Sequence, residues 1–173
     1  MKMFQYARNS PKRGPADFSR LTERWYRFAK WLGGDPVSVS TNCADCAILF
    51  ATADSSLHLR QSGRWWIVDT VDDRGHRRND TARFSTFDLA EKYLIWDWMS
   101  IAYTPIGKPS LWPRLYSRGF NPHVKSIALT NGRVELRSED GRALLTEPDA
   151  KIFSHLMLES LAEIERIITT GVE

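Results

Sequence analysis

The sequence predicts an α+β fold, in which a mainly antiparallel sheet built from hairpins and a meander packs against about three helices. The strand-like segments follow one another through short turns instead of alternating with helices, and this order favours antiparallel pairing. Three longer segments, at 18–32, 86–103 and 147–168, repeat apolar residues at helical spacing. The chain has 173 residues, of which 42% are hydrophobic and 26% charged, as is ordinary for one globular domain.

The first helix is expected over residues 18–32, after a loosely ordered basic segment at 1–16. Prolines and a glycine interrupt regular structure in that segment. Asp17 is a candidate N-cap for the helix. The apolar residues that form its buried stripe are Phe18, Leu21, Trp25, Phe28, Ala29 and Leu32. A pair of glycines and a proline soon after residue 32 end the helix.

The centre of the chain is predicted to contain strands at 44–53 and 57–60, followed by a hairpin. The first strand of the hairpin, 65–71, is rich in aromatic and β-branched residues, which suit a half-buried sheet. Residues 72–80, DDRGHRRND, are nearly all charged or polar and contain a glycine for a tight bend. We therefore expect a charged loop in water between this strand and a short returning strand at 82–84.

A helix over 86–103 is expected to follow the hairpin, because Ser85 and Asp88 have the spacing of a capping box. The next stretch, 104–122, contains Pro105, Pro109, Pro113 and Pro122, which disfavour a regular helix or a central strand. It is predicted to be an irregular linker, held to the body of the protein by apolar anchors that include Trp112 and Tyr116.

The last part of the chain is predicted to be a meander followed by one helix. Strands are expected at 126–130, 133–138 and 142–145, and Asn131-Gly132 is a strong hairpin signal between the first two. Thr146, with Pro148 and Asp149 close behind, starts the final helix. The domain prediction is a single α+β domain over 17–173, with a front unit at 17–103, the proline-rich linker at 104–122 and a back unit at 123–173.

The net charge of +3 is unevenly distributed along the chain. Residues 1–30 contain eight basic and two acidic side chains (8 − 2 = +6), whereas residues 146–173 contain two basic and six acidic ones (2 − 6 = −4). Either two solvated helix faces of opposite sign lie near each other, or a dipolar molecule is steered toward a charged partner. No apolar run of about 18 residues is present, so no membrane contact is expected. The N-terminus has no signal-peptide pattern, so a cytoplasmic location is the default expectation.

The Cys43-x-x-Cys46 motif invites a metal or redox interpretation. A structural zinc site needs four ligands, and the sequence offers two cysteines and four scattered histidines. A thioredoxin-like site needs a helix directly after the motif, but a strand-like run follows it here. Two incidental thiols are therefore favoured over redox sensing and over metal binding, and no metal or cofactor is expected.

The charged loop offers the best candidate for partner binding. Mixed charge at a hairpin tip is most often only solvated, but a rigid hairpin also presents both signs of charge in a fixed array. No nucleophile with an orienting base is evident, so no catalytic residue is assigned and the protein is predicted not to be an enzyme. The candidate partner-binding residues are Asp72, Asp73, Arg74, His76, Arg77, Arg78, Trp112 and Tyr116.

Trp65 and Trp66 invite an interpretation as a stacking platform for nucleic-acid bases. Adjacent residues of a strand point to opposite faces, so one ring is expected in the core and the other outside it or under a helix. The Arg-rich front half keeps nucleic-acid binding as an alternative function, although nucleic acid is not the favoured partner.

The central stretch combines a strand containing Trp and Val, an Asp-Arg-Gly turn, a returning strand that ends in Phe, and a helix with the sequence AEKYL. The positions that carry this pattern are Trp66, Val68, Asp73, Arg74, Gly75, Phe84, Leu89, Ala90, Glu91, Tyr93 and Leu94. With these residues the stretch resembles immunity proteins of bacterial polymorphic toxin systems, and specifically the immunity protein 61 family, similar to the immunity factor for a mycobacterial NAD-hydrolysing necrotizing toxin. The resemblance implies a non-enzymatic role, in which the protein binds one cognate toxin domain, such as an NAD glycohydrolase, and occludes its active site.

Overall fold

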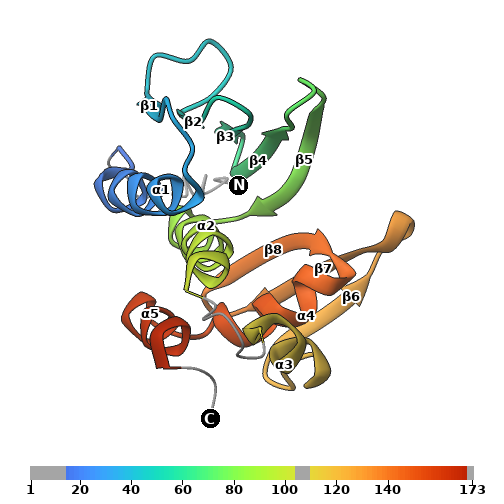
Figure 1. Ribbon diagram of the computed structural model, residues 1–173. Coiled ribbons are helices and arrows are strands. Elements are labelled where there is room, and N and C mark those ends of the chain that lie inside the picture. The colour runs from blue at the N-terminus through green and yellow to red at the C-terminus, as the bar shows by residue number, and fades with distance from the viewer. Residues whose placement is uncertain (1–14, 104–109, 171–173) are drawn as a thin grey trace, which may run out of the picture.

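The computed structural model describes residues 15–103 and 110–170, and within them eight strands form one sheet (Figure 1). All paired strands are antiparallel, in the order β1-β2-β3-β4-β5-β8-β7-β6. The α+β class and the mainly antiparallel sheet are thereby confirmed. The described residues form five α-helices, so the expectation of about three helices was too low. None of these helices has the length and apolar character needed to cross a membrane.

The elements follow one another along the chain with short connections. Their bounds are α1 (Ser19–Leu32), β1 (Ser38–Ser40), β2 (Ile48–Ala51), β3 (Ser56–Ser62), β4 (Trp65–Val71), β5 (Arg77–Phe84), α2 (Phe87–Ala102), α3 (Leu111–Ser117), β6 (Lys125–Ala128), β7 (Arg133–Ser138), β8 (Gly141–Thr146), α4 (Glu147–Leu156) and α5 (Leu161–Thr170).

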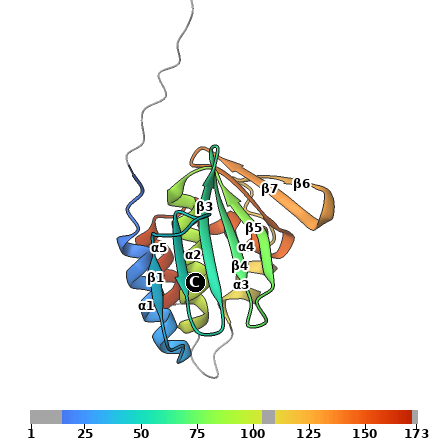
Figure 2. The same ribbon diagram turned by 90° about the horizontal axis from the view of Figure 1, so that it is seen from above.

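The helices lie on one side of the twisted sheet (Figures 1 and 2). α2 packs on β4 and β5, α4 packs on β7 and β8, and α1 and α5 flank α2. The strands before and after the linker belong to the same sheet, because Arg83 pairs with Leu144 and Phe84 with Ala143. Both parts of the chain therefore contribute to one hydrophobic layer between the sheet and the helices.

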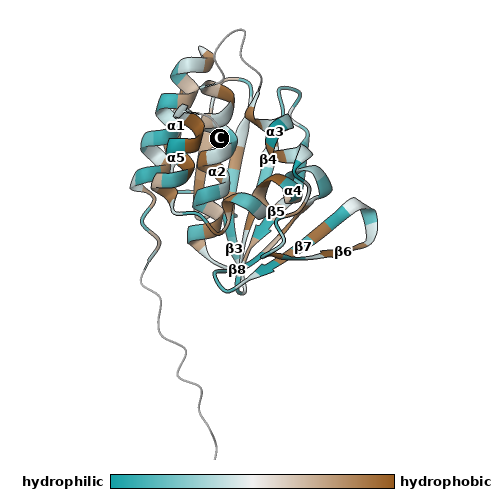
Figure 3. Cartoon of the chain, turned by 90° about the horizontal axis from the view of Figure 1, so that it is seen from below, coloured by the Kyte–Doolittle hydropathy of each residue, from teal (hydrophilic) through white to brown (hydrophobic). Residues whose placement is uncertain are grey.

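Aromatic side chains fill much of that layer. The Trp25 ring lies 5.1 Å from Trp98 and 5.8 Å from Phe50, measured between ring centroids. Trp66 is buried and packs against Phe18 and Phe87 at the other end of α2. Such offset and edge-on contacts add to the stabilisation from burial alone. Figure 3 shows the hydrophobic colour of the helices concentrated on the sides that meet the sheet.

Local signals placed most of the helix starts correctly, with two corrections. The N-cap of α1 is Phe18 and not Asp17, although Asp17 accepts a hydrogen bond from the Ser19 N–H (2.9 Å) at the helix start. The N-cap of α2 is Thr86, whose side chain accepts from the Leu89 N–H, and not Ser85. The Ser85 hydroxyl instead accepts the Arg142 N–H (2.8 Å) and so joins the helix start to β8.

The expected single final helix is broken into α4 and α5. Ser160 accepts a hydrogen bond from the Glu163 N–H (3.1 Å) and thereby caps a new helix start. The break allows α4 to pack on the sheet while α5 packs on α2. Both segments carry apolar residues at helical spacing, and this continuous pattern is why the sequence predicts one helix.

The predicted irregular linker contains a short helix, α3, which was not expected. Ser110 caps it by accepting the Trp112 N–H (3.3 Å), and Pro113 lies in the first turn, where its missing N–H breaks no hydrogen bond. Pro105 and Pro109 lie outside the described residues, as does most of the basic segment at 1–16. The Asn131-Gly132 turn is confirmed, with positive φ angles of 64° and 70°.

Candidate functional site

The sheet face opposite the helices, here called the open face, carries no described helix (Figure 2). Residues directly opposite one another on antiparallel strands point to the same side of a sheet. The pairing register therefore identifies this face residue by residue. One row across it consists of Arg60, Ile67, Arg83, Leu144 and Glu135 on β3, β4, β5, β8 and β7. The open face thus alternates charged and apolar side chains.

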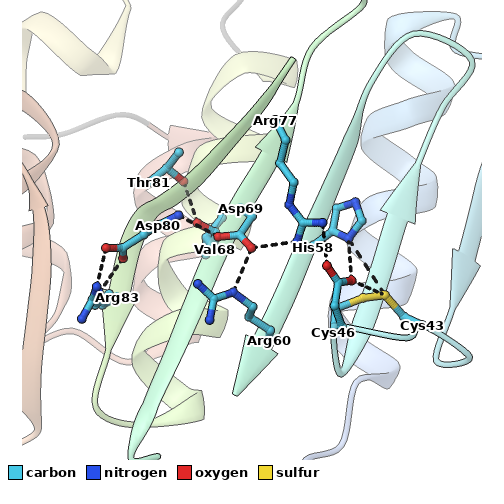
Figure 4. Close-up of polar contacts among 11 residues, drawn as sticks. Cys43, Cys46, His58, Arg60, Val68, Asp69, Arg77, Asp80, Thr81 and Arg83 are labelled. Atoms are coloured by element: carbon cyan, nitrogen blue, oxygen red, sulfur yellow. Dashed lines mark hydrogen bonds and ion pairs between the residues drawn. A yellow bond between two sulfur atoms is a disulfide. The ribbon is translucent and has the colours of Figure 1, made fainter. Parts of the chain in front are cut away.

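Asp69 lies at the centre of this face, with only 1% of its side chain exposed (Figure 4). Its carboxylate accepts hydrogen bonds from Arg60 Nε (2.9 Å), Arg77 Nη2 (2.9 Å) and the Asp80 N–H (2.7 Å). Burial alone would raise the pKa of Asp69, but these three donors outweigh it and lower the pKa. Asp69 is therefore held as a charged, fully hydrogen-bonded carboxylate.

A bulge in β5 explains why Asp80 lies so close to Asp69. The register shifts between Val68 and Thr70, and Asp80 adopts a φ of 58°, in the left-handed region. Its carboxylate accepts from Arg83 through two hydrogen bonds of 2.6 Å and from Arg133 Nη1 at 2.9 Å. The pKa of Asp80 is lowered, because hydrogen bonds from these two guanidinium groups outweigh the opposing effect of burial.

The hydrogen bonds and ion pairs join into one chain of contacts that extends from the β1–β2 connection to β7, here called the open-face network. Arg77 continues it outward, because its Nη1 lies 2.6 Å from Asp45 Oδ2. The arginine side chains keep part of their surface in contact with solvent, with exposures between 23% and 36%. The members of the open-face network are Asp45, Arg60, Asp69, Arg77, Asp80, Arg83 and Arg133.

A second group of charges lies beside the network on β7 and β8. Glu135 accepts from Arg142 Nε (2.7 Å) and Arg137 Nη2 (2.8 Å), and these bonds lower the pKa of Glu135. The Arg142 guanidinium also lies over the Trp65 ring, 5.3 Å from its centroid. Trp65 is therefore the outer ring of the Trp65–Trp66 pair, as the alternation of a strand predicts.

The predicted charged loop is shorter than expected, because β5 begins at Arg77. The turn is held by Asp72, whose carboxylate accepts the His76 N–H (2.9 Å) and the Arg74 N–H (3.0 Å). These bonds, that from His76 foremost, lower the pKa of Asp72. Asp73, Arg74 and His76 are exposed at the tip. Asp72 thus shapes the turn, while its neighbours are available to a partner.

The other predicted site residues do not gather at the hairpin tip. Arg77 belongs to the open-face network, and Arg78 is exposed on β5. Trp112 and Tyr116 lie on α3, which packs on α4 on the helix-covered side of the sheet (Figure 1). The Tyr116 ring receives the Lys151 ammonium 4.6 Å from its centroid. The structure therefore distributes the predicted residues over three separate places.

The two cysteines form a disulfide, Cys43–Cys46, so the prediction of two incidental thiols is wrong. The pairing of β2 with β3 also brings His58 beside them, with its Nδ1 3.9 Å from Cys43 Sγ. Asp45 Oδ1 lies 3.4 Å from the same sulfur. His58 follows Cys46 by twelve positions and has no motif spacing to it, so only the strand register reveals this group.

One open groove lies near these charges, and one small cavity lies on the helix-covered side. An open groove of about 390 Å³ lies between the β2–β3 and β4–β5 turns and is lined in part by Ala51, His58, Val71 and Asp72. On the opposite side, Asp97, Asp149 and Trp112 are among the residues that line a cavity of about 10 Å³. Burial, together with the nearby charge of Asp149, raises the pKa of Asp97 to about 6. That cavity has room for about one water molecule and none for a substrate.

The ends of the chain show how the uneven charge is arranged. Arg24 on α1 donates from Nε to Glu165 on α5 at 2.7 Å, so the basic and acidic helices lie side by side. Within the described residues this supports the simpler of the two interpretations, in which faces of opposite sign lie near each other.

Comparison with known proteins adds a fold relationship. No protein-family model matches the chain, and no curated protein matches it. Among solved structures, the chain is similar to Rv3902c from M. tuberculosis, with a TM-score of 0.69 over 94% of each chain and 13% sequence identity. At this level of identity the similarity shows a shared fold.

Proposed function

We propose that this protein is an immunity protein that binds a cognate bacterial toxin domain through its open face and occludes the toxin's active site. The observation that carries the proposal is the open-face network, in which the buried carboxylate of Asp69 and the partly buried carboxylate of Asp80 hold partly exposed arginines in fixed positions. A surface whose side chains are already ordered loses little conformational entropy on binding. Arg and Trp are also the residue types that dominate binding energy at protein interfaces.

The charge pattern of the open face suits a protein partner. The arginines and carboxylates alternate over short distances, so the face presents both signs in a fixed array rather than a uniform field. Complementary charges of this kind accelerate association and exclude wrong partners. Trp65, half-buried beside Arg142, supplies an apolar and aromatic anchor at the edge of the array.

The class of toxin rests on the resemblance to the immunity protein 61 family. Most of the positions that carry it, such as Trp66, Val68, Phe84 and Leu94, are buried in the core, so they support a shared fold. Asp73, Arg74 and Gly75 are the matching positions that lie exposed, at the hairpin tip. An NAD glycohydrolase is the toxin activity that the resemblance favours.

Co-expression tests the proposal directly. The toxin domain encoded beside this protein is expressed under an inducible promoter, with and without the protein. Rescue of growth, together with a complex that co-elutes on a sizing column, is the expected result. Absence of both rescue and complex would remove the proposal.

A second candidate function is nucleic-acid binding, which one observation favours. Trp65 has Arg142 5.3 Å and Arg64 5.9 Å from its ring centroid, an arrangement suited to base stacking beside phosphate contacts. The carboxylates of the network oppose this candidate, because they would repel phosphates. Binding to single-stranded oligonucleotides that weakens steeply with added salt would support it. Absence of binding at low salt would exclude it.

A further inference from the structure

Four potential metal ligands meet beside the open face, at the β1–β2 connection and on β3. One ligand atom from each lies within 4.8 Å of every other: a sulfur of Cys43, a sulfur of Cys46, a carboxylate oxygen of Asp45 and a ring nitrogen of His58 (Figure 4). Cys43, Cys46 and His58 are partly buried, whereas Asp45 is exposed. The group is therefore accessible to an ion from solvent.

The distances match the edges of a tetrahedral zinc site. Zinc binds sulfur at about 2.3 Å and nitrogen or oxygen at about 2.0–2.2 Å, which places neighbouring ligand atoms about 3.3–3.8 Å apart. Cys43 Sγ lies 3.4 Å from Asp45 Oδ1 and 3.9 Å from His58 Nδ1. His58 Nδ1 lies 3.7 Å from Asp45 Oδ1. Two of these three distances lie within the required spacing, and the third, from Cys43 Sγ to His58 Nδ1, exceeds it by about 0.1 Å.

The surrounding residues leave the required atoms free and orient them. The Ser56 hydroxyl lies 3.3 Å from His58 Nε2, so the other ring nitrogen, Nδ1, faces the cysteines. Arg77 Nη1 binds Asp45 Oδ2 at 2.6 Å and leaves Oδ1 directed at the group. Partners of this kind fix the orientation of metal ligands in known sites. Arg77 also balances charge, because a zinc ion with two thiolates and one carboxylate carries a net charge of −1.

We propose that reduction of the Cys43–Cys46 disulfide creates a zinc site formed by Cys43, Asp45, Cys46 and His58. A dithiol reductant transfers two electrons and two protons to the disulfide, giving two thiols and the oxidised reductant. Zinc then binds as both thiols lose their protons to solvent. Two thiolates, one imidazole and one carboxylate form a ligand set that favours Zn²⁺ over Mg²⁺ or Ca²⁺.

The site would add metal–ligand bonds between two segments that only non-covalent contacts join in the oxidised protein, where Asp45 lies 3.7 Å from His58 and 2.6 Å from Arg77. In the disulfide form, the covalent bond closes only residues 43–46. In the zinc form, the β1–β2 connection is attached to β3 through His58 and, by way of Asp45 and Arg77, to the open-face network. Redox state and zinc together would then set how firmly this edge of the open face is held.

The experiment uses the full chain reduced under anaerobic conditions with a phosphine reductant, with Zn²⁺ as the probe. After removal of unbound metal on a desalting column, the expected result is one zinc per chain for the reduced protein and almost none for the oxidised protein. Co²⁺ in place of Zn²⁺ should give thiolate-to-cobalt charge-transfer bands and the visible bands of a tetrahedral site. A reduced protein without stoichiometric zinc would overturn the proposal.

Variants assign the ligands. The double variant C43S/C46S should lose zinc, and His58→Asn should weaken binding about tenfold or more, as loss of a ligand or its support does in other sites. His123→Asn is the matched control, because His123 is exposed and lies in another part of the chain. Circular dichroism confirms that each variant folds. Zinc affinity that is unchanged in His58→Asn, or equally reduced in His123→Asn, would contradict the assignment.

Discussion

The two faces of the same strands are organised by different physical principles. On the helix-covered face, Leu59, Val68, Ala82 and Phe84 are fully buried and apolar, and the fold gains stability from their burial. On the open face, one buried carboxylate, Asp69, organises a set of arginines. The helix-covered face therefore contributes most of the burial that stabilises the fold, whereas the open face can carry the side chains of a binding surface. The predictions below test this division, from the largest expected effect to the smallest.

Two neighbouring residues on β5 give the sharpest contrast, since Phe84 points into the core and Arg83 to the open face. Phe84→Ala should lower the free energy of unfolding by about 3–5 kcal/mol, because it leaves a cavity among packed rings. Arg83→Ala should cost about 1 kcal/mol or less, because Asp80 keeps Arg133 as a partner. Urea unfolding measures both values, and equal losses would contradict the division between the faces.

Asp69 is a charged open-face residue whose replacement should destabilise the fold almost as much as replacement of a core residue. Asp69→Ala removes the acceptor of Arg60, of Arg77 and of the Asp80 N–H, so we expect a loss of about 3 kcal/mol or more. Asp73→Ala, at the exposed hairpin tip, serves as a control with an expected change near zero. A loss at Asp69 no larger than at Asp73 would show that the network does not stabilise the fold.

The pH dependence of the Asp69 effect has a defined sign. The pKa of Asp69 is lowered in the folded protein, so its contribution is present above the pKa of an unfolded aspartate, about 3.9, and is lost as the pH falls further. The difference in unfolding free energy between wild type and Asp69→Ala should therefore shrink below pH 4. A difference that grows on acidification would contradict this assignment.

Asp97, on the helix-covered side, should show the opposite behaviour. Its folded pKa is raised from 3.8 to about 6, so wild-type stability should decrease as the pH rises from about 4 to about 6 and then level off. Asp97→Asn should raise the unfolding free energy at pH 7 by about 1–3 kcal/mol and change it little at pH 4. Thermal unfolding at the two pH values measures this difference, and a variant that is destabilised at pH 7 would oppose it.

The sequence predicted the helix-covered face far better than the open face, for a physical reason. Apolar periodicity is a local signal, so α1, α2 and β4 were predicted within a few residues, whereas β5 begins at Arg77, five residues before the predicted strand. The break after α4 was hidden because apolar periodicity continues on both sides of it. The helix α3 was not predicted because the prolines of the 104–122 stretch disfavour a helix, although Pro113 lies in a first turn, where a helix tolerates it.

The candidate site was only partly predictable, because its contacts depend on strand register. The hairpin was recognised as charged, but the bulge that places Asp80 against Asp69 has no local signature. Arg133 reaches Asp80 across 53 positions of the chain, and His58 reaches Cys43 across 15. Arg77 was named as a partner-binding residue for its charge alone, whereas its place in the network follows from β5 beginning at that residue.

The central claim, that the open face binds the toxin domain, is tested most directly by measuring toxin affinity for variants of the two faces. Trp65→Ala and Arg137→Glu change the open face, and Arg114→Glu changes exposed α3 on the helix-covered side. We expect the two open-face variants to weaken binding about tenfold or more, as loss of an interface anchor does, with Arg114→Glu near wild type. Weakened binding by Arg114→Glu, with both open-face variants unchanged, would contradict the claim.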